Sequence, residues 1–260
     1  MSLVFKDSLF DAQWLRAVGH SSSGGAEVGE CFAAAGLIRE PNVESWFGAW
    51  TKIAAHVLEE AQQSEVHGHS ASALAAYLRA SNYFRTAYTF LIGTPVDSRV
   101  VSSYRRQRAA FEAAARLMHP VAERISTPYG AAKLHGYLFR AADDALMRAT
   151  LIIPGGYDST AEETYFFSAA AAIARGYTCI VFDGPRQGAA LIEDKLVFRP
   201  DWEAVVSPMV DFATRRPEVD PAKIALMGIS FGGYLAPRAA STEPRLAACV
   251  ADPGEFSLLE

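Results

Sequence analysis

The residues with the clearest chemical potential stand at positions 228–232, which read Gly-Ile-Ser-Phe-Gly with Ser230 at the centre. An apolar run typical of a buried strand, "KIALM", precedes them, and a helical pattern follows. A nucleophilic serine needs such a strand–turn–helix setting, because its turn is so tight that only small residues fit two positions to either side. The helix that follows directs free N–H groups at the reacting oxygen. The pattern predicts that Ser230 is a nucleophile; a plain glycine-rich turn is the alternative.

A second glycine pair, Gly155-Gly156, follows the apolar strand pattern "LIIP". Parallel strands that end at one edge of a sheet would bring these glycines close to Ser230. We expect the N–H of Phe231, together with that of Gly156 or Tyr157, to bind the negative charge that develops in the transition state. The sequence leaves the choice between the last two donors open. The alternative is that the glycines only turn the chain toward the next helix.

The loop "FDGPRQG", residues 182–188, follows the next apolar strand. Asp183 precedes the serine in the chain, which disfavours it as the catalytic acid of this arrangement. We expect its carboxylate to brace the loop by accepting backbone N–H bonds. Arg186 either faces the site or is solvated, and both readings stay open.

The activating base of the serine is missing from the expected place. The order in such enzymes is Ser, then acid, then His, but no histidine follows Ser230. Asp252 and Glu255 could offer an acid, although solvation is the favoured reading for both. A serine without a base is a poor nucleophile at neutral pH. None of the chain's histidines occupies the expected position after the serine. All six precede Ser230, and they are His20, His56, His67, His69, His119 and His135.

None of these histidines predicts a metal site or a cofactor. His56 lies on or beside an apolar helix face, where packing is the usual role. His67 and His69 share a short polar loop, but a metal there would need further ligands that the sequence does not supply.

The elements that must position Ser230 fall into two halves, 1–120 and 121–260. In the first half, apolar residues recur at spacings of three and four, as Trp46, Trp50 and Val57 do, which predicts helices with one buried face. These helices are expected at 42–61, 70–91 and 98–118. No 34-residue repeat is present, so an array of helical repeats is not expected.

In the second half, apolar runs alternate with helical patterns, which predicts a mostly parallel sheet covered on both faces. Two strands around a Pro-Tyr-Gly turn open this half, at 122–130 and 131–141. Further strands are expected within 148–156, 177–185, 223–230 and 246–254, with helices near 160–175, 201–216 and 231–241.

The composition is that of a globular protein with an acidic balance. The net charge of −5 argues against nucleic acid as the main partner. A short basic cluster, Arg105, Arg106 and Arg108, is expected on a solvated helix face.

Neither a signal peptide nor a membrane span is indicated, and the cytoplasm is the expected location. Three widely spaced cysteines are expected to be reduced, with Cys179 and Cys249 in the core.

Four stretches carry a resemblance to a known group: "YLRASNYFRTAYTFL", "PGGYDSTAEE", "FDGPRQG" and "GISFGGYLAPRAASTEPRLAACVADPGEF". From about Trp46 onward the chain resembles α/β-hydrolases with an N-terminal helical cap. This group includes 2,6-dihydroxypseudooxynicotine hydrolase, fungal polyketide-shortening hydrolases and FrsA-like esterases. The resemblance implies hydrolysis of a C–C bond in a β-diketone-like substrate, or of an ester, by a Ser-Asp-His triad in a pocket between core and cap. Ser230 matches the nucleophile, and Gly155, Gly156 and Tyr157 match the oxyanion loop.

We therefore expect a helical cap or substrate-pocket domain at 1–120 and an α/β-hydrolase core at 121–260 that lacks its last strands. The triad Asp and His are expected beyond residue 260, so that this 260-residue chain by itself would be inactive. The alternative is a non-catalytic interaction module, in which the helical half binds a partner. The expected ligand is a small molecule, with no nucleic acid, membrane or cofactor, and with a homodimer left open. The sequence does not separate a C–C hydrolase from an esterase or a peptidase.

Overall fold

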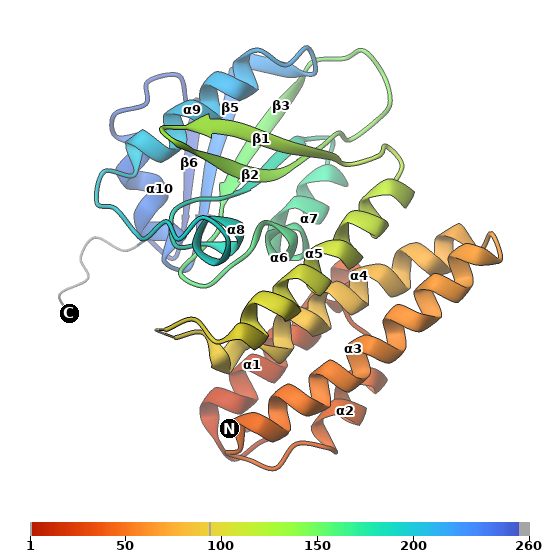
Figure 1. Cartoon of the computed structure of the whole chain (residues 1–260). Helices are drawn as coiled ribbons and strands as arrows, with labels where there is room; N and C mark the ends of the chain where they lie inside the picture. Colours follow the sequence, from red (N-terminus) through yellow and green to blue (C-terminus); the bar gives the residue numbers. More distant parts are fainter. Residues whose placement is uncertain (1, 94, 255–260) are drawn as a thin grey trace. The chain divides into compact units, whose positions relative to one another are not determined.

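The computed structural model describes residues 2–93 and 95–254 (Figure 1). The chain separates into two units, Met1–Met118 and His119–Glu260. The first unit is helical and centred on buried aromatic side chains, whereas the second contains a six-stranded sheet with an aliphatic core. The boundary falls beside His119-Pro120, where the expected third helix has ended.

The first unit consists of helices whose apolar positions lie on one face. Trp46 and Trp50 are fully buried, as the spacing predicted, and the Trp46 indole N–H donates to the carbonyl of Thr86 at 2.8 Å. The side chain of Asn42 caps its helix by accepting the N–H of Ser45. The α-helices are α1 Ser8–Gly19, α2 Val28–Ala35, α3 Val43–Val66, α4 Ser70–Ala87 and α5 Ser98–Leu117, with 3₁₀ turns at His20–Ser23 and Thr89–Leu91.

Two details of this unit differ from expectation or refine it. The side chain of His56 is 69% exposed, and its Nε2 lies 3.2 Å from a carboxylate oxygen of Glu60. The predicted packing role of His56 is therefore wrong, because its side chain lies outside the buried face of α3. The basic cluster on α5 is largely solvated, as predicted. Within it, the Arg106 guanidinium stacks 4.1 Å above the ring of Phe84.

The second unit is built on a sheet with the order β1-β2-β4-β3-β5-β6. β1 and β2 form an antiparallel hairpin that joins β4 antiparallel, while β3, β4, β5 and β6 are mutually parallel. The turn of the hairpin falls at Gly130, which has φ +57°, one residue beyond the predicted Pro-Tyr-Gly centre. The strands are β1 Glu123–Tyr129, β2 Ala132–Phe139, β3 Arg148–Pro154, β4 Thr178–Asp183, β5 Val219–Ile229 and β6 Ala248–Asp252.

Helices after each parallel strand return the chain across the sheet. α9 and α10 cover one face through a core of buried aliphatic side chains and Trp202. α6 and α7 follow β3, joined by a π-helical turn at Tyr165–Ala169. This is the fold of the α/β-hydrolases, as predicted. The helices are α6 Ala161–Thr164, α7 Ala170–Ile173, α8 Gly188–Ile192, α9 Glu203–Thr214 and α10 Gly232–Ala240.

One face of the sheet carries an open apolar groove of about 500 Å³ beside β6. β6 pairs only with β5 among the described strands, and Val250 is 45% exposed. Cys31 and Cys179 are buried, but Cys249 is exposed, so the prediction that it lies in the core is wrong. The apolar pattern around Cys249 does belong to a strand; what differs is that nothing in the described part of the chain covers it.

No helix in the described ranges, 2–93 and 95–254, has both the length and the apolar character to cross a membrane. The buried positions of the predicted strands and helices otherwise follow their apolar periodicities, so local pattern and tertiary burial agree through most of the chain.

Candidate active site

Ser230 stands on the turn between β5 and α10, as its sequence context predicted. Its φ is +56°, a left-handed conformation that is unfavourable for a residue with a Cβ and is typical of a nucleophile on a strained turn. A Cβ at Gly228 would overlap the backbone of Gly232, and one at Gly233 would overlap the carbonyl of Pro253. The glycines are therefore a steric requirement of the turn.

Both polar groups of the Ser230 backbone form hydrogen bonds. Its N–H donates to the Asp252 carbonyl at 2.6 Å, and its carbonyl accepts the N–H of Gly233 at 2.7 Å. Within the described part of the chain, the Ser230 Oγ has no hydrogen-bond partner, and the residue is exposed. The side chain of Asp252 is exposed too, and Glu255 lies outside the described residues.

The Gly155–Tyr157 segment lies directly against this turn. A Cβ built on Gly156 would be 3.2 Å from the Ser230 Cβ and 2.9 Å from the Ile229 carbonyl oxygen. The Gly156 N–H already donates to the Ser159 Oγ at 2.9 Å. The N–H groups of Tyr157 and Phe231, in contrast, have no acceptor among the residues that the structure describes. Two unused donors thus flank the exposed serine.

Gln187 braces this segment, and sequence reasoning missed it. The side chain is fully buried, and its amide Nε2 donates to the carbonyls of Gly155 at 2.5 Å and Gly156 at 2.9 Å. Its Oε1 accepts the N–H of Gly184 at 2.8 Å. With their carbonyls held by Gln187, the two glycines keep a fixed orientation. The only available signal was a glutamine inside a loop that follows a buried strand.

Asp183 has the bracing role that the sequence predicted. It is 2% exposed, and its two oxygens accept the N–H of Ala161 at 2.7 Å and of Ala189 at 2.8 Å. These donors stand at the first turns of α6 and α8, where free N–H groups and the helix dipole favour a negative charge. The carboxylate ties two short helices to the end of β4.

An aromatic cluster surrounds the turn. The Phe231 ring lies 4.9 Å from that of Phe198, 5.8 Å from Tyr234 and 6.2 Å from Tyr157, measured between ring centroids. Arg186 reaches over this cluster: its guanidinium carbon lies 4.4 Å from the Tyr157 ring centroid, and its Nη2 donates to the Tyr157 hydroxyl at 3.0 Å. Of the two open readings for Arg186, the geometry favours the one that faces the site.

His135, the histidine of the sheet, does not reach the serine. His135 pairs with Asp183 across β2 and β4, and its Nε2 lies 4.0 Å from a carboxylate oxygen of Asp194. β2 is three strands from β5 in the sheet, or roughly 14 Å at the usual strand spacing. In the described ranges, no cluster of three or more His, Cys, Asp or Glu residues has the arrangement of a metal site.

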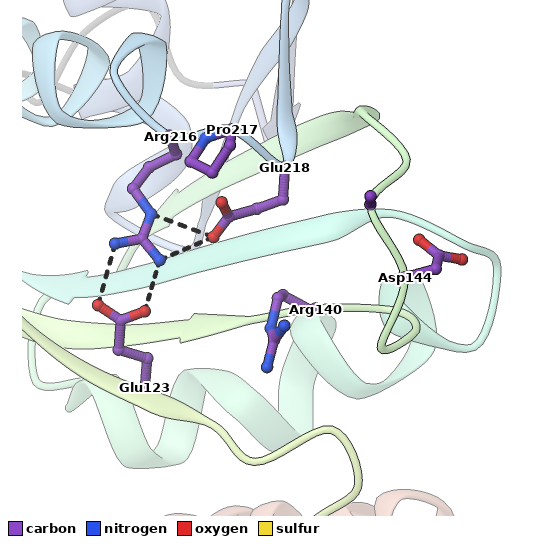
Figure 2. A pocket seen from close by; sticks show the side chains of 7 residues that line it. Glu123, Arg140, Asp144, Arg216, Pro217 and Glu218 are labelled. Carbon is purple, nitrogen blue, oxygen red and sulfur yellow. Dashed lines mark hydrogen bonds and ion pairs between the residues drawn. The ribbon is translucent and has the colours of Figure 1, made fainter.

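A charged pocket of about 450 Å³ lies near the N-terminal ends of the parallel strands β3 and β5, away from the ends that carry the serine turn (Figure 2). Arg216 bridges Glu123 and Glu218 there, and Arg140 and Asp144 also line the pocket. Arg140 pairs with Asp143, and Asp144 pairs with Arg148. Because its charges are internally compensated and far from Ser230, this pocket does not belong to the candidate site.

The chain is similar in sequence to several curated fungal hydrolases. It is 38% identical over 268 residues to the 20-hydroxy-prefusarin hydrolase FUS2 of Gibberella moniliformis, covering 100% of this chain and 64% of the relative. It is 39% identical over 268 residues to the alpha/beta hydrolase psoB of Aspergillus fumigatus, covering 98% of this chain and 60% of that protein. The chain thus spans less than two thirds of the length of these relatives.

Structural comparison leads to the same group. The crystal structure of 2,6-dihydroxy-pseudo-oxynicotine hydrolase matches with a TM-score of 0.78 at 27% identity, covering 90% of this chain and 64% of that chain. The alpha/beta hydrolase family model matches residues 150–259, which include both the Gly155–Tyr157 segment and the Ser230 turn. The resemblance inferred from the sequence is confirmed: residues 150–259 match the alpha/beta hydrolase family.

Proposed function

We propose that the protein containing this chain is a serine hydrolase that cleaves an ester, or a C–C bond next to a carbonyl, in a small organic molecule. One observation carries the proposal: Ser230, in a left-handed conformation with a free hydroxyl, stands beside two N–H groups that have no acceptor in the described residues. Backbone donors aimed at a reacting oxygen are the main requirement of an oxyanion hole. The similarity to fungal hydrolases supports the same chemistry.

In the proposed mechanism, the Ser230 Oγ attacks the substrate carbonyl carbon while a base removes its proton. The carbonyl oxygen becomes an oxyanion, which the N–H groups of Phe231 and Tyr157 bind. Because the Gly156 N–H is already engaged by Ser159, Tyr157 is the better second donor. The tetrahedral intermediate collapses, the bond to the leaving group breaks, and the leaving group takes up the proton. Water then hydrolyses the acyl-serine and restores the hydroxyl.

The base is proposed to come from outside these 260 residues. No histidine follows Ser230, and the histidine of the sheet lies three strands away. The chain covers 64% of its relative FUS2, which leaves room in a protein of that length for an Asp and a His. By this proposal, the 260-residue chain alone hydrolyses its substrate very slowly.

The proposed substrate is a small carbonyl compound with an aromatic or β-diketone-like part. The rings of Tyr157, Phe198 and Phe231 supply an apolar surface beside the serine. Relatives whose names specify a substrate act on 20-hydroxy-prefusarin and 2,6-dihydroxy-pseudo-oxynicotine, both small organic molecules. We propose that the protein works in the cytoplasm.

The test compares two lengths of the protein with a fluorophosphonate probe. We expect the 260-residue chain to label slowly at Ser230, because loss of a triad member costs on the order of 10⁴–10⁶-fold in rate. A version extended along the coding frame should label rapidly, and its Ser230→Ala variant should not label. Rapid labelling of the 260-residue chain would refute an external base. An extended protein that neither labels nor hydrolyses esters or β-diketones would favour a non-catalytic module.

A further inference from the structure

Arg186 has a backbone conformation that is unusual for a residue with a side chain. Its φ is +77°, in the left-handed region where glycine is favoured, and it is followed by Gln187, which braces the Gly155–Tyr157 segment. Its N–H donates to the Leu196 carbonyl at 2.8 Å, so the strained backbone is fixed. An arginine at a position whose backbone conformation favours glycine points to a use for its side chain.

The guanidinium of Arg186 is only partly used by the protein itself. It donates one hydrogen bond to the Tyr157 hydroxyl and stacks on the same ring, yet no carboxylate of the described chain pairs with it. Arg199, Arg216 and Arg245 each bind at least one carboxylate. A guanidinium has five N–H donors, so Arg186 keeps donors and an uncompensated positive charge at a half-buried position.

This charge lies close to the nucleophile. Tyr157, which carries the guanidinium, follows Gly156, and a Cβ on Gly156 would be 3.2 Å from the Ser230 Cβ. The Tyr157 ring also packs edge-on against Phe231, the residue after the serine. A substrate whose carbonyl is held at Ser230 would therefore extend within reach of Arg186.

We propose that Arg186 determines specificity by binding a carboxylate on the substrate, next to the carbonyl group that Ser230 attacks. The planar guanidinium can hold both oxygens of a carboxylate, which gives orientation as well as charge recognition. Tyr157 keeps the guanidinium in place by hydrogen bonding and stacking. This assignment rests on the proposed hydrolase function and narrows its substrate class to acidic carbonyl compounds.

The test measures binding in the Ser230→Ala chain, so it does not depend on turnover. Two anilides serve as probes: succinanilate carries a carboxylate where butyranilide carries a methyl group. We expect calorimetry to show that succinanilate binds at least about tenfold more tightly than butyranilide, because its carboxylate can form a charged, hydrogen-bonded pair with Arg186. Arg186→Gly should reduce this preference to within about threefold, and Arg186→Lys should keep an intermediate preference because it retains the charge without the planar fork.

Lys195→Gly is the matched control. Lys195 is also a cation with positive φ, +59°, in the loop that follows α8, but its Nζ donates to the Ile192 carbonyl. This change removes one positive charge and the same kind of strain, and it should preserve the preference for succinanilate.

Two outcomes would overturn the proposal. If Arg186→Gly weakens both probes equally, Arg186 only orients Tyr157; if the parent shows no preference for succinanilate, no carboxylate site exists there. The hydrolase function is judged separately by fluorophosphonate labelling. A preserved preference with no labelling of the extended protein would mean a carboxylate-binding site without catalysis.

Discussion

Gly156 lies so close to the turn at Ser230 that a side chain would not fit between them, although more than seventy residues separate the two positions in the chain. A Cβ on Gly156 would lie 3.2 Å from the Ser230 Cβ and 2.9 Å from the backbone oxygen of Ile229. The second distance is shorter than real Cβ contacts, and a backbone oxygen on a strained turn cannot easily move. The segment that carries the proposed oxyanion donor Tyr157 therefore depends on a glycine at this position.

Gly156→Ala is expected to push this segment away from the turn. In the catalytically complete protein, turnover should fall on the order of 10²-fold or more, the typical effect of losing one oxyanion donor. Stability should fall by only about 1–2 kcal/mol. Steady-state kinetics and urea unfolding measure the two effects. Gly48→Ala, at a helix position where a Cβ meets nothing within 4 Å, is the control and should leave turnover unchanged. Full activity in Gly156→Ala would remove this segment from the site.

Gln187→Ala should destabilise the second unit and slow catalysis together. It leaves the carbonyls of Gly155 and Gly156 and the N–H of Gly184 without their buried partner, at a cost of about 1–3 kcal/mol. Gln187→Glu should be worse, because a carboxylate would face two carbonyls. Urea unfolding gives the stability change, and the exposed Gln62→Ala is the control. Equal stability of Gln187→Ala and the parent chain would contradict the bracing role.

Asp183→Asn tests a structural role against a catalytic one. The asparagine side chain lacks the negative charge that stabilises the N–H groups at the first turns of α6 and α8. The free energy of unfolding should therefore fall by about 1–3 kcal/mol. The pH dependence of kcat in the complete protein should keep its shape. A catalytic acid would behave differently: its loss would reduce kcat by orders of magnitude and leave the unfolding midpoint nearly unchanged.

The three thiols should differ sharply in reactivity. Burial raises the pKa of Cys31 and Cys179 to about 12, from 9.0 in the absence of the fold. A disulfide reagent should therefore modify only the exposed Cys249 in the native chain, and Cys249→Ser should abolish that reaction. Modification of two or three thiols in the folded chain would contradict the buried positions.

The raised pKa values of Cys31 and Cys179 also predict that the folded chain loses stability in alkali. A group whose pKa is raised by folding contributes stability below its unfolded pKa, and this contribution is lost as the pH rises through the folded value. The free energy of unfolding should thus decline from about pH 9 upward, by at most ~1.4 kcal/mol per pH unit for each thiol. Cys179→Ala should show a shallower decline than the parent. A stability that is flat between pH 9 and 11 would argue against these raised pKa values.

The edge at β6 should make the 260-residue chain self-associate. β6 has one partner among the described strands, and Val250 is exposed beside the apolar groove; unpaired edges with apolar side chains invite pairing. We expect concentration-dependent dimers or larger species in size-exclusion chromatography with light scattering. Val250→Lys should shift the chain toward monomer, whereas Val66→Lys, at an exposed position of α3, should not. A compact monomer at all concentrations would refute this expectation.

Local sequence determined the helices, the strands and the tight turn at Ser230. Trp46 and Trp50 follow a helical period, and continuous apolar runs mark β3, β4 and β5 as strands of a parallel sheet, so both kinds of element were readable from spacing alone. The turn at Ser230 was readable because glycine is sterically required on both sides of the serine. The predicted brace at Asp183 followed from a carboxylate placed just after a strand.

Only the tertiary structure decided which groups meet at the turn. Gln187 reaches Gly155 and Gly156 because β3 and β4 are neighbours and their loops leave the same edge of the sheet. The Gly156 N–H donates to the Ser159 hydroxyl, whereas the Tyr157 N–H has no acceptor in residues 2–93 and 95–254, and this difference depends on the rotation of the Ser159 side chain. Cys249 was wrongly assigned to the core because an apolar pattern reports what a strand can bury, whereas exposure depends on whether another element covers it. Periodicity is a property of the chain, but coverage and contact are properties of the fold.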